Sequence, residues 1–68
     1  MNKFKMNNSV KVLDGKYEGM AGIVTEIKQD EKTKKYKYKL HIEGVKDGEP
    51  VSADYWCEEE NGEHLHGY

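Results

Sequence analysis

Three lysines at alternate positions, Lys35, Lys37 and Lys39, are the residues with the clearest chemical potential in this sequence. Alternate residues on one face of a strand lie about 6.7 Å apart, and a row of ammonium groups at that spacing could follow a sugar–phosphate backbone. Lys34, beside the row, and Lys16, from an earlier loop, could extend the same footprint. The competing interpretation is that lysines on a solvent-exposed strand keep the strand soluble and protect its edge from pairing.

Three aromatic residues form the second candidate set. Tyr17 lies in a loop that contains glycines, and Tyr55 and Trp56 end a later apolar segment. An exposed ring could stack on a nucleic-acid base, which adds Tyr17 to the nucleic-acid set, and the three rings together could hold an extended peptide. Large aromatic side chains of small domains usually belong to the core. We expect Trp56 to be buried and Tyr17 to be exposed.

An acidic run follows these aromatic residues and could present a negative patch to a basic partner protein. A charge run in a polar turn is equally well explained as a solvated surface. The candidate protein-interaction residues are Tyr17, Tyr55, Trp56, Glu58, Glu59 and Glu60.

Metal binding and catalysis find little support in the residue pattern. Cys57, His64 and His66 have metal-binding side chains, but their spacing, Cys-x₆-His-x-His, is not a common zinc pattern. The sequence has no nucleophile elbow, no phosphate-binding loop and no carboxylate pair within an apolar run. We therefore expect a protein without a metal site, without a cofactor and without enzymatic activity.

Size limits the class of protein. The 68 residues are enough for one domain, and a chain of this length buries only about 60% of its unfolded surface. A single cysteine excludes an internal disulfide framework, and no apolar run reaches the roughly 18 residues needed to cross a membrane. The first residues lack the apolar segment of a secretory signal. We expect a cytoplasmic protein that does not bind membranes.

The charges are unevenly distributed along the chain. The net charge is −2, which by itself argues against a dedicated nucleic-acid binder. Residues 1–39 nevertheless carry ten lysines and five acids, whereas residues 40–68 carry one lysine and eight acids. Such a split can indicate opposed basic and acidic faces.

Turn-forming residues divide the chain into five expected strands. Residues 1–8 show no periodicity and are interpreted as a flexible N-terminal arm, with Phe4 or Met6 as its possible anchor. The expected strands are 9–13, 22–28, 35–42, 51–55 and 63–66, with loops at 14–21, 29–34 and 43–50 and one 3₁₀ turn within 57–62. Short strands at this spacing predict an all-β single domain over residues 9–68, a small barrel or sandwich.

The clearest strand is 35–42, in which every even position is apolar or aromatic and every odd position is basic or polar. This alternation is typical of a half-buried strand. The residues expected to be largely buried are Val12, Val24, Tyr38, Leu40, Ile42 and Val51, and Tyr36 and Leu65 are expected to face inward from their strands.

A glycine-rich loop joins the first two expected strands. Gly15 accepts the positive φ of a turn at little cost, and Gly22 allows a neighbouring backbone to approach closely. The pattern Val10-x-Val12, Gly15, Gly19-x-x-Gly22-x-Val24-x-x-Ile27 resembles the KOW motif, which opens small SH3-like β-barrels in ribosomal proteins and transcription elongation factors. The resemblance implies a five-stranded SH3-like barrel with a KOW-type loop, and a nucleic-acid, ribosome-associated or transcription-associated partner.

Two functional hypotheses follow. The first is a small binding module for nucleic acid, or for a ribosome- or transcription-associated protein. Its contact residues would be Lys16, Tyr17, Lys34, Lys35, Lys37 and Lys39. The second is a protein–protein interaction domain of a phage or mobile-element accessory protein, with no affinity for nucleic acid. A continuous basic face would favour the first hypothesis, whereas lysines neutralised by neighbouring Glu and Asp would favour the second.

Overall fold

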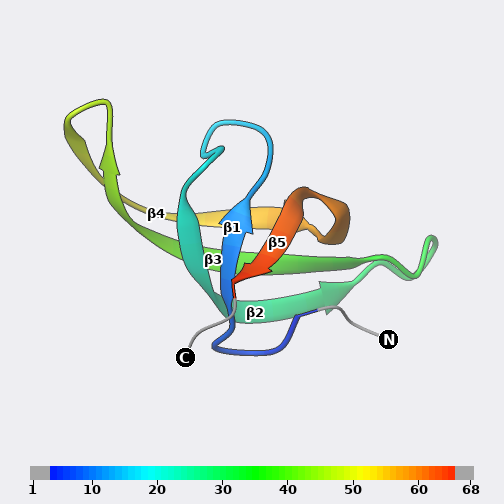
Figure 1. Ribbon diagram of the computed structural model, residues 1–68. Coiled ribbons are helices and arrows are strands. Elements are labelled where there is room, and N and C mark those ends of the chain that lie inside the picture. Colours follow the sequence, from blue (N-terminus) through cyan, green and yellow to red (C-terminus); the bar gives the residue numbers. More distant parts are fainter. Residues whose placement is uncertain (1–3, 66–68) are drawn as a thin grey trace.

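Five antiparallel strands form one sheet in the computed structural model, which describes residues 4–65 (Figure 1). The strands are β1 (Ser9–Val12), β2 (Ala21–Gln29), β3 (Tyr36–Lys46), β4 (Glu49–Glu58) and β5 (Gly62–Leu65), and a 3₁₀ turn, η1 (Glu59–Asn61), joins the last two. Their order in the sheet is β4-β3-β2-β1-β5. Among these residues no pairing joins β4 to β5, so the sheet is not closed into a barrel. The all-β prediction with five strands is confirmed.

The hairpin of β3 and β4 is longer than the sequence predicts. The expected loop at 43–50 is only a two-residue turn, because Asp47 and Gly48 both adopt positive φ, 53° and 81°. Two such residues form the turn type that matches the twist of a hairpin. The strands therefore pair from Lys46 and Glu49 onward without interruption. Pro50 is accommodated because β4 is an edge strand.

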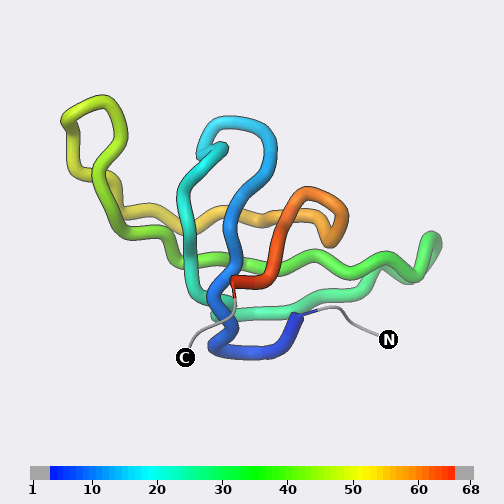
Figure 2. The backbone as a smooth tube through the Cα atoms, in the orientation of Figure 1, coloured from blue at the N-terminus to red at the C-terminus, as the bar shows by residue number. Residues whose placement is uncertain are grey.

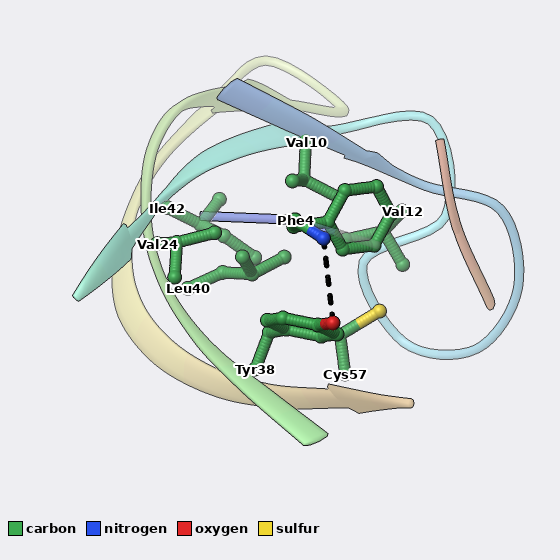
Figure 3. Close-up of a cluster of buried hydrophobic side chains, with 8 residues drawn as sticks. All are labelled: Phe4, Val10, Val12, Val24, Tyr38, Leu40, Ile42 and Cys57. Carbon is green, nitrogen blue, oxygen red and sulfur yellow. Dashed lines mark hydrogen bonds between the residues drawn. The ribbon is translucent and has the colours of Figure 1, made fainter. Parts of the chain in front are cut away.

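The core lies on one side of this curved sheet (Figure 3). Its fully buried side chains are Phe4, Val10, Val12, Val24, Tyr38, Leu40, Ile42 and Cys57. Burial of Val12, Val24, Tyr38, Leu40 and Ile42 confirms most of the predicted core. Tyr36, Val51 and Leu65 are half-buried, and the first two pack against the edge of this cluster.

The predicted burial of Trp56 is wrong. Its side chain is 39% exposed, whereas the neighbouring Cys57 is buried. The reason is that β4 continues to Glu58, so strict alternation governs both residues. Cys57 lies opposite Tyr38 and shares its inward face, and Trp56 must therefore point outward.

The N-terminal segment contributes to the domain from Phe4 onward. The Phe4 ring packs edge-on against Tyr38 at 4.8 Å between centroids, and its backbone N–H donates to the Tyr38 hydroxyl at 3.3 Å (Figure 3). The N–H of Asn7 donates to the carbonyl of Val24 at 2.9 Å, and the N–H of Val24 donates to the carbonyl of Asn8 at 3.0 Å. Phe4 is thus an anchor of the predicted arm.

Gly22 is required by the close contact of β2 with β3. A Cβ at this position would lie 2.9 Å from Cγ1 of Ile42 and 3.0 Å from the carbonyl oxygen of His41. Both distances are shorter than ordinary packing permits. The close approach predicted from the sequence is confirmed, and it fixes the register that places His41 beside Ile23.

Candidate functional site

The outer face of β2, β3 and β4 brings together four of the predicted site residues, Lys37, Lys39, Trp56 and Glu58. We call this surface the outer face; it is the side of the sheet turned away from the core. Three cross-strand rows define it. They are Lys28–Lys37–Glu58, Glu26–Lys39–Trp56 and Ile23–His41–Asp54, each read from β2 through β3 to β4. All nine side chains are at least partly exposed.

The lysine row of β3 does not form a continuous basic surface. Lys37 lies directly opposite Glu58, and Lys39 lies directly opposite Glu26. Facing pairs of opposite charge stabilise a sheet modestly. Lys28, opposite Lys37 on the other side, has its ammonium 4.0 Å from a Glu26 carboxylate oxygen. Each lysine of this face therefore has a carboxylate beside it.

Lys34 and Lys35 lie at the tip of the β2–β3 hairpin, next to the outer face. Lys34 has a positive φ of 64° and is exposed, and the Lys35 ammonium is 3.9 Å from a Glu60 carboxylate oxygen. The tip is ordered by Asp30, whose carboxylate accepts from the N–H groups of Thr33 and Lys32 at 3.0 and 2.8 Å. These two bonds, Thr33 first, lower the pKa of Asp30.

Trp56 supplies the only large aromatic surface among the residues of the three rows. Lys39 flanks it on β3, and the ammonium of Lys28 lies 5.2 Å from the centre of its ring system. An ammonium over an indole face is attracted by the ring electrons. An exposed indole held between cations and carboxylates is amphipathic, which is typical of residues that anchor interfaces.

Lys16 and Tyr17 lie away from the outer face. They belong to the β1–β2 loop, which Figure 2 shows at a different end of the molecule from the β2–β3 hairpin tip. Tyr17 is half-buried rather than exposed as predicted, because its ring packs edge-on against Tyr55 at 5.3 Å. Tyr55 is an inward residue of β4, so Tyr17 and Tyr55 meet on the inner side, while Trp56 lies on the opposite side of the sheet.

The three glutamates of the acidic run have three different surroundings. Glu58 belongs to the outer face, opposite Lys37. A carboxylate oxygen of Glu59 accepts a short hydrogen bond, 2.6 Å, from the Tyr38 hydroxyl. Glu60 lies near Lys35. The run is therefore not a single acidic patch, and only Glu58 of these three contributes directly to the rows around Trp56.

His41 is a member of the outer face that sequence reasoning missed. Its Nε2 lies 2.8 Å from a Glu43 carboxylate oxygen, and its Nδ1 lies 3.2 Å from one of Asp54. The hydrogen bonds with Glu43 and then Asp54 raise the pKa of the imidazole above its ordinary value. The strand alternation already placed His41 on the lysine side of β3; the missing information was the register that brings Asp54 opposite it.

The outer face is also hollowed beside His41. A shallow depression of about 320 Å³ lies between β1, β2 and β3, with Ile23, His41 and Glu43 among its lining residues. The glycine at position 22 contributes to its floor. The depression could receive one side chain of a partner, but it is too open to enclose a substrate.

Metal-ligating residues do not converge in residues 4–65, where no group of three or more His, Cys, Asp or Glu could hold an ion. Cys57 is a buried free thiol, and burial, followed by the charge of Glu58, raises its pKa. The His64 ring lies 6.4 Å from the Phe4 ring. His66, the third residue of the sequence set, lies outside the described residues.

Comparisons with known proteins give no relatives: no family model, no curated protein and no solved structure matches this chain. In residues 4–65 no helix has the length and apolar character needed to cross a membrane.

Proposed function

We propose that this chain is a non-enzymatic protein-interaction module that binds a partner protein through the outer face, with Trp56 at the centre of the contact. The observation that carries the proposal is the exposed indole at the β4 end of the second of three rows, in which each lysine has a neighbouring carboxylate. Exposed tryptophan contributes strongly to protein interfaces, and interspersed charges give specificity for a complementary protein surface.

The charge arrangement is what favours a protein over a nucleic acid. A phosphate backbone requires cations that are free to replace its counterions. On the outer face Lys37 and Lys39 lie opposite Glu58 and Glu26, and these carboxylates would be brought close to the phosphates. The net charge of −2 adds a general repulsion.

The finer description of the fold belongs to the same proposal. We infer an SH3-like arrangement, because β1 pairs with both β2 and β5 and side chains from β1 to β4 converge on one core. The KOW-like pattern is supported locally by Gly15 and Gly19, which both have positive φ in the β1–β2 loop. The proposed binding of a partner protein through the outer face does not depend on the nucleic-acid contacts of KOW loops.

Affinity capture tests the proposed function. Tagged chain is incubated with a nuclease-treated lysate of the cells that produce it, and retained proteins are compared between wild type, Trp56→Ala and Leu13→Ala. Leu13 is a matched control, since it is 43% exposed but lies in the β1–β2 loop. We expect a discrete protein that wild type and Leu13→Ala retain and Trp56→Ala loses. Equal retention by all three variants would contradict the proposal.

Nucleic acid is the second candidate, and one observation favours it. Lys28 and Lys37 lie directly opposite each other on β2 and β3; facing like charges are unfavourable, and a phosphate bound between them would reduce their repulsion. The test is an NMR titration with a short single-stranded oligonucleotide at low salt. Shifts over residues 34–41 that disappear in the Lys35, Lys37 and Lys39 to Gln triple variant would support this candidate.

A further inference from the structure

We propose that the free edge of β4 binds an extended basic segment of the partner, which joins the sheet as an additional antiparallel strand. This inference rests on the proposed function and names the chemistry of the partner. Four observations carry it: the direction of the β4 backbone groups, the lack of edge protection, the charge of the edge and the pattern that β3 already presents to β4.

The direction of the backbone groups follows from the sheet register. Val24 exchanges hydrogen bonds with Asn7 and Asn8 on the β1 side, so the groups of its neighbour Ile23 face β3. Backbone groups alternate in direction along each strand. Ile23 lies opposite His41, so the groups of His41 face β2 and those of Leu40 and Ile42 face β4.

The same alternation continues into β4. Leu40 lies opposite Tyr55 and Ile42 lies opposite Ala53, so the N–H and C=O groups of Tyr55 and Ala53 bond to β3. The groups of Ser52, Asp54 and Trp56 therefore point toward the open edge. An independent contact agrees with this assignment, since the carbonyl of Lys39 accepts from the Thr25 hydroxyl of β2 at 3.2 Å.

Within residues 4–65, the β4 edge has no lysine, bulge or covering strand to prevent strand addition, and its exposed charges are carboxylates alone. Natural edge strands are protected by lysines, by bulges, by proline or by a covering element. Residues 49–58 contain no lysine, and their register with β3 runs through ten consecutive pairs without a bulge. Pro50 protects only the beginning of the strand. Among residues 4–65 no other strand pairs with this side of β4, so its backbone is open to pairing from Ser52 onward.

Charge selects the partner. The outward side chains along this edge include Asp54, Trp56 and Glu58, and β4 contains no cation. On its paired side this row faces His41, Lys39 and Lys37 of β3. A second strand with basic residues at alternate positions would present the same pattern from the open side, with one cation beside each carboxylate and one near the indole.

The charge of the edge also argues against a second copy of this chain as the added strand. Antiparallel pairing of β4 with β4 would bring two rows containing Asp54 and Glu58 together, and facing like charges destabilise a sheet. The side chains between the basic residues of the partner would lie on the inner side, beside Ala53 and the half-buried Tyr55. The fitting segment therefore alternates basic and small apolar residues.

A titration with a designed peptide tests the inference. The probe is a short, end-blocked peptide in which lysine and valine alternate, added to the ¹⁵N-labelled chain. In antiparallel pairing the lysine N–H groups would face β4 and the valine N–H groups would face away. We expect N-methylation of the lysines to weaken binding about tenfold or more, and N-methylation of the valines to have little effect.

Hydrogen exchange gives a second readout. The amides of Ser52, Asp54 and Trp56 should exchange more slowly in the complex, while those of Ala53 and Tyr55, already bonded to β3, should change little. Glu58→Gln should weaken the peptide several-fold, and Glu63→Gln, on the other edge strand β5, should not.

Three results would overturn strand addition at the β4 edge. Shifts on the outer face with equal binding of both N-methylated peptides would overturn strand addition and leave the proposed function standing. The absence of shifts along β4 would also overturn the inference, and the Trp56→Ala capture experiment would then decide the proposed function separately. Concentration-dependent protection of the β4 amides without peptide would identify a second copy as the occupant and overturn the inference.

Discussion

Replacement of Phe4 by Ala tests whether the N-terminal segment is part of the core. The Phe4 side chain is fully buried, and its ring centre lies 4.8 Å from that of Tyr38. The ring also packs against the backbone of Gly62, where a Cβ would lie 3.2 Å from Cε2 of Phe4. Truncation of a buried phenylalanine costs about 3–5 kcal/mol. A domain of this size has a total stability near the lower end of roughly 5–15 kcal/mol, so the variant should lose most of its margin.

Thermal and urea denaturation, both followed by far-UV circular dichroism, measure this loss. For a domain of 60–100 residues about 1 kcal/mol corresponds to a melting shift of roughly 4–8 °C, so Phe4→Ala should melt at least about 12 °C below wild type. Met6→Ala is the matched control, because Met6 lies in the same segment and is 50% exposed. Met6→Ala should unfold at the same urea concentration as wild type. If Phe4→Ala does so too, Phe4 does not belong to the core.

Three further predictions follow from the same contacts. Leu40 is fully buried, so Leu40→Ala should lower the free energy of unfolding by about 2–5 kcal/mol and shift the urea midpoint downward. An unchanged midpoint would exclude Leu40 from the core. The hydrogen bonds of His41 raise its pKa above 6.5, so their contribution to the free energy of unfolding is complete below about pH 6.5 and is lost as pH rises through the folded pKa. His41→Gln should flatten the pH dependence of stability in this range. A titration midpoint of His41 below 6.5 by NMR would refute the raised pKa. EDTA should leave the melting temperature unchanged, and a drop of several degrees would reveal a structural metal.

The sequence predicts the fold best where a pattern is local. The alternation of 35–42 places Tyr38, Leu40 and Ile42 in the core, because a period of two leaves only one choice of buried face. The close approach at Gly22 was likewise predictable, since a glycine at the start of a β-branched strand is typical of a position where a second backbone packs closely.

The candidate site was harder to predict because it depends on register between strands. The neighbours of Lys37 and Lys39 are Glu58 and Glu26, which are far apart in sequence. The position of Trp56 was missed because β4 extends beyond its predicted end, and the alternation of the longer strand places Trp56 on the outer face and Cys57 in the core. The Asp47-Gly48 turn was visible in the sequence and could have corrected the predicted loop at 43–50, because it lets β3 and β4 pair up to Lys46 and Glu49.

Site-specific photo-crosslinking in the producing cells tests directly whether the outer face binds a partner protein. A photoreactive amino acid replaces Ser52, which is exposed on β4 beside the outer face, or Glu18, which is exposed in the β1–β2 loop. We expect a discrete, nuclease-resistant protein adduct from position 52 that is absent from position 18. An adduct that nuclease removes, or equal protein adducts from both positions, would contradict the claim that this chain binds a partner protein through the outer face.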